Sequence, residues 1–151
     1  MKLGVRIGGH PLHAMLSDFP LVLFLSWVGL DAGALLGGSA WLWEVGHWAL
    51  VAGLIAAGFT ALAGFLDYVG LPETKPQAVP TANVHLLLML SVTLLALVSL
   101  LFRSLQPPRE GVALVSHAGA LILVAGGLTV GGWFGGHLVF HHGVGVDEER
   151  R

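Results

Sequence analysis

The chain of 151 residues contains no cysteine, a single tyrosine and few charged side chains. Without cysteine it forms neither disulfides nor thiolate-ligated iron–sulfur clusters nor thioether-attached haem, so any haem would be held non-covalently. Charged residues make up 11% of the chain and give a net charge of −2, with no basic patch that would attract nucleic acid. No phosphate loop, HExxH motif or activated nucleophile is recognisable, so hydrolysis and phosphoryl transfer are weakly supported.

Hydrophobic residues, in contrast, make up 55% of the chain and form four long runs. A hydrocarbon core of about 30 Å is crossed by about 20 apolar residues in a helix. The sequence predicts spans at about 17–37, 45–69, 83–104 and 112–140, joined by short linkers that contain glycine or proline. We therefore expect an all-α membrane protein, a single up-down-up-down four-helix transmembrane domain over residues 1–151 that contacts the lipid bilayer. No convincing internal repeat is visible.

The few cations suggest an orientation in the membrane. One face would hold five of them and the opposite face only Arg103 and Arg109, so the positive-inside tendency predicts cytoplasmic termini. No removable signal peptide is expected, because polar residues interrupt the first apolar stretch. The five cations on the predicted cytoplasmic face are Lys2, Arg6, Lys75, Arg150 and Arg151.

Eight histidines gather near the ends of the predicted spans. At the outer face, His47 and His117 would lie at comparable depth on diagonal helices, as two axial haem ligands do, and Arg103 could meet a haem propionate. At the inner face, the candidates are His10, His13, His85 and His142. A transition metal bound by His47, His117, His13 or His85 is an alternative, and so is simple solvation of interfacial imidazoles.

Three glycines recur at every fourth position of the last span: Gly127, Gly131 and Gly135. Such a stripe allows a second helix or a flat ligand to approach the backbone closely, and helix packing is the commoner use. His117 lies 18 residues before Gly135, five helical turns, and therefore shares that face.

Three carboxylates fall within or beside the spans: Asp18, Asp31 and Asp67. Charge is expensive in a bilayer, so we expect them to face the bundle interior, to be paired or to be protonated, with roles as hydrogen-bond partners of ligands or as a proton relay. Asp67 could orient His85 as a hydrogen-bond partner, and Asp31 could bond a nearby tryptophan.

The two ends of the chain resemble the bacterial membrane-protein family known as domain of unknown function 2231. The matching segments are Gly9-His10-Pro11-Leu12-His13, Phe19-Pro20, Gly132-Trp133, Gly135-Gly136 and His142-Gly143-Val144-Gly145-Val146. Asp31, Asp67 and His85 also stand at positions that look like the family pattern. The chain departs from it at Ala14 and Asp18, where proline and histidine are usual, and at His137 and His141, which replace glutamate and arginine. His47 and His117 are not hallmarks of the family.

The resemblance implies a four-span module of the bacterial cytoplasmic membrane that occurs alone or joined to Rieske or cytochrome domains. It points toward electron transfer by association only. Our first hypothesis is a membrane redox subunit, rather than a stand-alone enzyme, that binds one or two b-type haems through histidine pairs and exchanges electrons with a quinol or a partner protein of a larger complex. The alternatives are a proton or metal permeation module and a cofactor-free accessory subunit.

Overall fold

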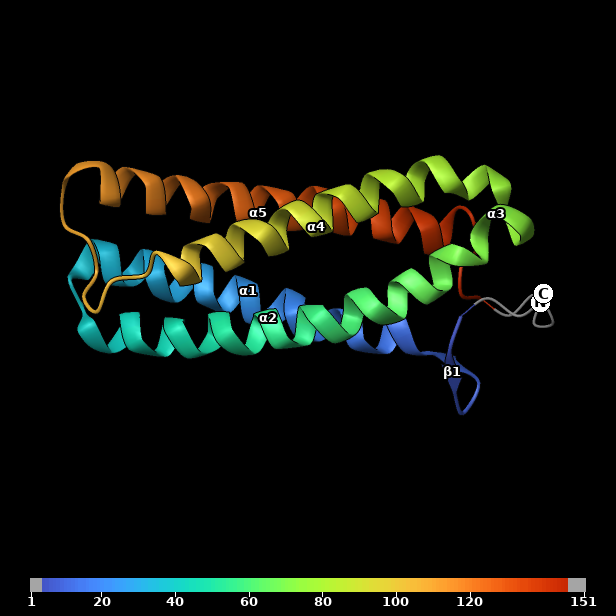
Figure 1. Cartoon of the computed structure of the whole chain (residues 1–151), viewed down its shortest axis with the longest axis horizontal. Helices are drawn as coiled ribbons and strands as arrows, with labels where there is room; N and C mark the ends of the chain where they lie inside the picture. Colours follow the sequence, from blue (N-terminus) through green and yellow to red (C-terminus); the bar gives the residue numbers. More distant parts are fainter. Residues whose placement is uncertain (1–3, 147–151) are drawn as a thin grey trace.

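The structure is a computed structural model that describes residues 4–146. Four long helices dominate it (Figure 1): α1 (Leu12–Gly37), α2 (Ala40–Val69), α4 (Val79–Leu101) and α5 (Gly111–Phe140). Within the described residues, four helical segments are long and apolar enough to cross a membrane. The predicted all-α fold with four membrane helices is confirmed. Lys2, Arg150 and Arg151, which enter the charge count, lie outside the described residues.

Short elements close the two ends of the bundle. Strands β1 (Arg6–Ile7) and β2 (His10–Pro11) pair antiparallel before α1, and α3 (Leu71–Thr74) with the 3-10 helix η1 (Pro76–Ala78) joins α2 to α4. We call this end of the bundle the α3 end. The opposite end holds the α1–α2 turn and the connection 102–110, and we call it the loop end.

The four helices form two hairpins, α1 with α2 and α4 with α5, and helices within a hairpin pack more extensively than helices of different hairpins. Consecutive long helices run in opposite directions in Figure 1. Gly38 allows the tight first turn because its φ of 66° lies in the left-handed region, where glycine pays no steric penalty. Ser39 then starts α2, since its hydroxyl accepts a hydrogen bond from the amide of Leu42.

The buried positions of the second hairpin repeat those of the first. Phe24 and Trp27 of α1 are buried, and so are Ala96 and Ser99 of α4, which stand 72 residues later, the same separation as between the bonded pair Asp31 and Arg103. The buried residues of α2 and α5 correspond in the same way with an offset one residue shorter: Leu50, Gly53, Ala57 and Thr60 match Leu121, Val124, Leu128 and Gly131. The two hairpins therefore present equivalent faces to each other.

Side-chain volumes at these equivalent positions are complementary. Where α1 has Phe24 and Trp27, α4 has alanine and serine, whereas Gly53 and Ala57 of α2 correspond to the larger Val124 and Leu128 of α5. Large side chains of one hairpin thus have room beside small ones of the other. The result is one apolar core in the middle of the bundle.

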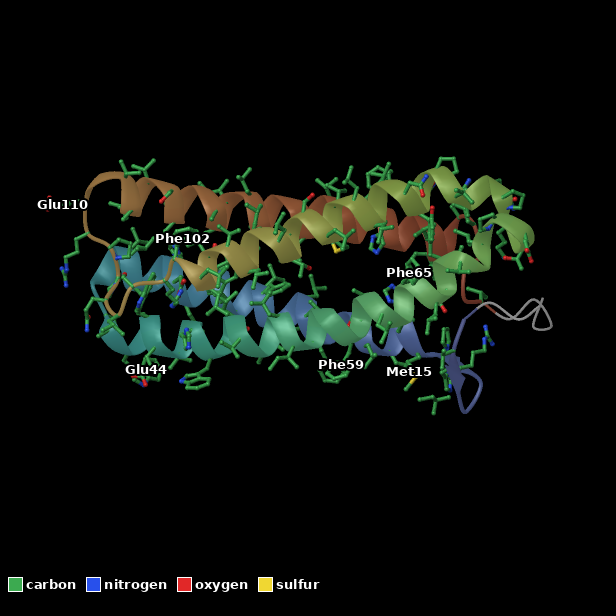
Figure 2. All side chains as sticks on the ribbon, viewed as in Figure 1. Met15, Glu44, Phe59, Phe65, Phe102 and Glu110 are labelled. Carbon is green, nitrogen blue, oxygen red and sulfur yellow. The ribbon has the colours of Figure 1, made fainter. Side chains whose placement is uncertain are left out.

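The outer surface of the bundle is apolar along its length. Met15 and Phe59 point away from the bundle in Figure 2, and both are exposed, as are Phe65 and Phe102. An apolar surface of this extent on long helices fits a lipid environment.

Candidate functional site

Two polar clusters lie inside the bundle, one near each end, with the apolar core between them. At the loop end the centre is Asp31 of α1, whose side chain is fully buried. Its carboxylate accepts two hydrogen bonds from Arg103 at 2.6 and 2.7 Å, one from the indole N–H of Trp27 at 2.7 Å and one from Nε2 of His117 at 2.9 Å. We call Asp31, Arg103, His117, Trp27 and Trp43 the carboxylate cluster.

The Arg103 guanidinium is almost as buried as its partner, with 4% of its side chain exposed. It also donates to the backbone carbonyl of Trp43 at 2.6 Å and lies 3.7 Å from the centre of the Trp43 ring, within cation–π range. Trp43 in turn donates its indole N–H to the carbonyl of Ser104. The bidentate ion pair is therefore enclosed by aromatic rings, and both hairpins contribute to it.

A glycine of α2 makes room for this ion pair. A Cβ atom at Gly46 would stand 2.2 Å from Oδ1 of Asp31 and 3.4 Å from the guanidinium of Arg103. No side chain fits there without moving the carboxylate, so the backbone of α2 packs directly against the cluster.

The carboxylate cluster differs from the arrangement predicted for the loop end. His117 bonds to Asp31 and packs against Trp27 and Trp43, while the ring of His47 lies against its neighbour Trp48. The structure therefore brings His117 to a carboxylate rather than to His47. Arg103, which we expected at a haem propionate, is held by Asp31 instead, because a buried carboxylate inside the bundle is the strongest available partner for it.

At the α3 end, His13 of α1 is fixed against the backbone of α2. Its Nδ1 lies 3.0 Å from the carbonyl oxygen of Thr60, so Nδ1 carries the proton and donates, and Nε2 keeps its lone pair. Gly64, one turn further along α2, allows this contact, because a Cβ atom there would stand 2.7 Å from the imidazole. The tautomer and the position of the ring are both set by α2.

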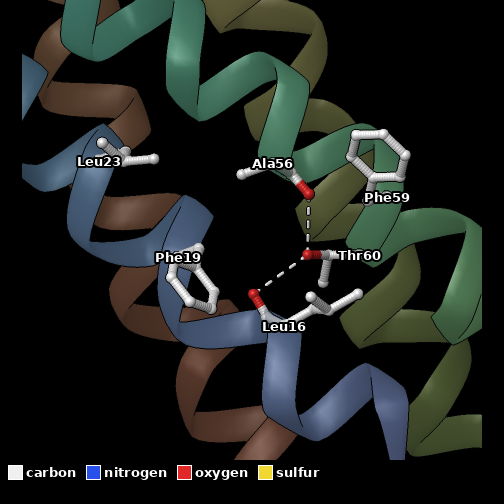
Figure 3. A pocket seen from close by; sticks show the side chains of 6 residues that line it. All are labelled: Leu16, Phe19, Leu23, Ala56, Phe59 and Thr60. Atoms are coloured by element: carbon white, nitrogen blue, oxygen red, sulfur yellow. Dashed lines mark hydrogen bonds between the residues drawn. The ribbon is translucent and has the colours of Figure 1, made fainter.

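The side chain of Thr60 strengthens the same junction. Pro20 lacks an amide hydrogen, so the carbonyl of Leu16 has no helical donor four residues on. The Thr60 hydroxyl lies 3.2 Å from that carbonyl and 2.9 Å from the carbonyl of Ala56 (Figure 3). A shallow apolar groove of about 340 Å³ lies over this junction, with Phe19 and Phe59 at its rim, and both rings are exposed. Thr60 thus holds the first turns of α1 through its hydroxyl and its carbonyl.

His85 of α4 repeats this arrangement on the second hairpin. Its Nδ1 lies 2.8 Å from the carbonyl oxygen of Gly131 of α5, and a Cβ atom at Gly135 would stand 3.1 Å from the imidazole. His13 thus bonds to a carbonyl 47 residues later, and His85 to a carbonyl 46 residues later. In both cases the ring also lies beside the glycine one helical turn after that carbonyl. His13 and His85 are within electrostatic range of each other.

The glycine stripe of α5 packs against α4 along its whole length. Gly127 faces Val92 and Gly131 faces Met89, as Gly135 faces His85. Close helix packing, the commoner of the two uses considered for such a stripe, accounts for the first two contacts.

The other predicted residues of the α3 end are distributed differently from our expectation. Asp67 is half-buried and lies in electrostatic range of His13 and Arg6, whereas His85 donates its hydrogen bond to the Gly131 carbonyl rather than to Asp67. Asp18 is exposed on the outside of α1, so the expectation that it faces the interior is wrong. Each residue along a helix turns the side chain by about 100°, and Asp18 therefore lies on a different side of α1 from the buried Phe24 and Trp27.

His10 and His142 also lie apart from His13 and His85. His10 is exposed in strand β2, and His142 lies beyond the end of α5, where its Nε2 is 3.2 Å from the hydroxyl of Thr81. Partial burial lowers the pKa of His142, and so do the neighbouring charges of His141, His137 and Lys75.

Sequence reasoning expected a tryptophan beside Asp31 without naming Trp27, and it missed the roles of Trp43 and Thr60. Trp27 stands four residues before Asp31, one helical turn, and that spacing was the available signal for the hydrogen bond between them. Thr60 and Trp43 act through backbone carbonyls as much as through their side chains, and a carbonyl leaves no trace in the residue pattern.

The fold and both clusters define a four-helix membrane protein with buried polar groups near each end of an apolar bundle. A family model described as "Predicted membrane protein (DUF2231)" matches residues 9–148, so the chain belongs to that family. No curated protein and no solved structure matches the chain.

Proposed function

We propose that this protein is a membrane-embedded electron-transfer subunit that binds b-type haem between His13 and His85. The proposal differs from our sequence hypothesis for the outer face, because the loop-end histidine His117 is committed to Asp31. It keeps His13 and His85, two of the inner histidines that match the family pattern.

The observation that carries the proposal is the equivalence of the two hairpins. Asp31 stands 18 residues after His13, which is five helical turns along one face of α1. Arg103 likewise stands 18 residues after His85 and follows the end of α4 by two residues. Asp31 and Arg103 meet across the bundle at the loop end. The same two faces, about 27 Å further along the helices, therefore bring His13 and His85 toward each other at the α3 end.

The residues present fit haem as a ligand, and His13 and His85 would hold it through their imidazoles. Both histidines donate from Nδ1 to a carbonyl and leave Nε2 as the ligand atom, which is how metal-bound histidines are usually held. Gly64 and Gly135 let each imidazole pack directly against the backbone of its neighbouring helix. When bound, haem b would supply reversible one-electron chemistry at a potential tuned by its ligands and burial.

The chain's own contribution is to orient the two histidine ligands and to separate them from the polar cluster at the other end. The carbonyls of Thr60 and Gly131 fix both tautomers and make the imidazoles more basic ligands. The apolar core around Phe24, Leu50 and Val124 separates this end from the carboxylate cluster. That apolar middle also favours the redox proposal over a proton or metal pathway through the bundle, which would need polar groups along its length.

The proposal includes a place in the cell and a partner. We place the protein in the bacterial cytoplasmic membrane with its α3 end toward the cytoplasm, because the sequence assigns five cations to that face and two to the other. Electrons would be exchanged there with a quinol or with another subunit of a membrane redox complex.

The test is an absorption spectrum of the detergent-purified protein before and after dithionite, with iron analysis. We expect reduced α and β bands with stoichiometric iron, and loss of the same band in His13→Ala and in His85→Ala. His47→Ala is the matched control and keeps the full spectrum. His85→Met guards against a folding defect, because a methionine ligand would retain haem and raise its potential. A featureless spectrum and no iron in protein purified with its native partners would overturn the proposal.

A further inference from the structure

Three histidines converge where α5 ends, outside the region assigned to haem. Their ring nitrogens, one from each of His137, His141 and His142, all lie within 4.8 Å of one another. His141 is exposed and the other two are half-buried, so the group is open to the aqueous phase at the α3 end. We call these residues the histidine triad.

The way α5 terminates brings the three side chains together. The amides of His141 and His142 both donate to the carbonyl of His137, at 3.0 and 3.2 Å, and the amide of Gly143 donates to Val139. Gly143 then turns the chain with a φ of 64°, a conformation that favours glycine. Positions i and i+4 share a helix face, and the turn places i+5 beside them.

The rings form a compact aromatic group at the surface. Trp133 stacks on His137 with ring centres 5.5 Å apart, and His137 stacks on His141 at 4.4 Å, both with interplanar angles of 13°. His142 meets His137 and His141 edge-on, at 5.2 and 4.9 Å. A groove of about 470 Å³ runs beside Trp133, His137 and His141, so a small ion has access to them.

A hydrogen bond already orients one of the three ligands. Nε2 of His142 lies 3.2 Å from the hydroxyl of Thr81 on α4. With its proton on Nε2 and donated to Thr81, the ring presents the lone pair of Nδ1. Ligating histidines are commonly held in this way by a partner on the other nitrogen.

We propose that the histidine triad binds one divalent transition-metal ion of the zinc class, with three imidazole ligands and a fourth position open to water. A set of neutral nitrogen ligands suits Zn²⁺, Ni²⁺ and Cu²⁺ and does not suit Mg²⁺ or Ca²⁺, which take oxygen ligands. Zinc–nitrogen bonds of about 2.0–2.1 Å require the three nitrogens to approach to about 3.4 Å. Rotation of the exposed His141 ring out of its stack on His137 supplies most of that movement.

The surroundings set the strength of the site. Lys75 donates from Nζ to the carbonyls of His142 and Gly143, at 3.1 and 2.9 Å, and thereby fixes the turn. Its positive charge also opposes a dication, so the site suits reversible uptake better than a permanent structural role. Bound metal would tie the end of α5 to the following turn and, through Thr81, to α4.

The test is zinc binding by the full-length protein in detergent, purified without a histidine tag and measured by calorimetry and elemental analysis. We expect one equivalent of zinc, lost in His137→Ala and in His141→Ala. Thr81→Val should weaken binding by about 10- to 100-fold, as loss of a partner to a metal-bound histidine does. X-ray absorption of the loaded protein should show nitrogen ligands at about 2.0–2.1 Å.

Two matched variants separate this site from other histidines. His10→Ala removes an exposed imidazole at the same end of the bundle and should leave zinc binding unchanged. His85→Ala removes a haem ligand candidate and should also retain zinc, so the metal site and the haem proposal fail independently. Unaltered zinc binding in both His137→Ala and His141→Ala, or no zinc binding by the wild-type protein, would overturn the inference.

Discussion

Removal of the buried carboxylate at the loop end should be among the most damaging single changes in this chain. Asp31 is fully buried and accepts four hydrogen bonds, two of them from an arginine whose side chain is 4% exposed. Asp31→Ala leaves that guanidinium buried without its counter-charge, which costs about 3–5 kcal/mol of unfolding free energy. The carboxylate also serves Trp27 and His117, whose donors lose their acceptor at the same time.

The assay is reversible unfolding in mixed detergent micelles, arranged as a double-mutant cycle. Asp31→Leu and Arg103→Met should each lower the unfolding free energy by about 3–5 kcal/mol, because each leaves one buried charge alone. The double variant should lose less than the sum of the two and should be closer to wild type than either single variant. Single variants within about 0.5 kcal/mol of wild type, or strictly additive losses, would refute the view that the ion pair is desolvated and coupled.

Two further changes address the α3 end. Gly64→Ala places a Cβ atom 2.7 Å from the His13 imidazole, so we expect the ring to move. The reduced haem spectrum should then weaken or shift. A wild-type spectrum would contradict the close approach of the ring to Gly64. Thr60→Val removes the hydroxyl that serves the Leu16 carbonyl and should lower the unfolding free energy by about 1–3 kcal/mol, whereas Thr60→Ser should restore most of it. Equal stability of the valine and serine variants would show that the hydroxyl contributes nothing.

The fold could be predicted from the sequence because its signal is spread over many residues. Four apolar runs of membrane-spanning length need no particular side chain to be recognised. The partners inside the bundle could not be predicted in the same way. His117 and His47 were expected at comparable depth on diagonal helices, but the choice of partner depended on Asp31 of α1 and on Arg103 in the connection after α4. Depth along a helix is readable from sequence, and contacts between helices are not.

The correspondence between the hairpins was missed for a related reason. It is carried by burial and by a few side chains, such as His13 with His85, rather than by residue identity. At most equivalent positions the two hairpins differ in volume, as at Trp27 and Ser99, because a large side chain on one face requires a small one opposite. Complementary packing therefore erases the similarity that a search for repeats would detect.

The same correspondence explains why the two ends of the bundle can have different chemistry. A contact between equivalent positions is repulsive when both carry the same charge, so the meeting of positions 31 and 103 requires opposite charges, which Asp31 and Arg103 supply. His13 and His85 stand at equivalent positions with identical side chains, and under our proposal both would serve as ligands of one haem. The ion pair at the loop end thus holds the two hairpins together. At the α3 end, the proposed haem would be bound by one histidine from each hairpin.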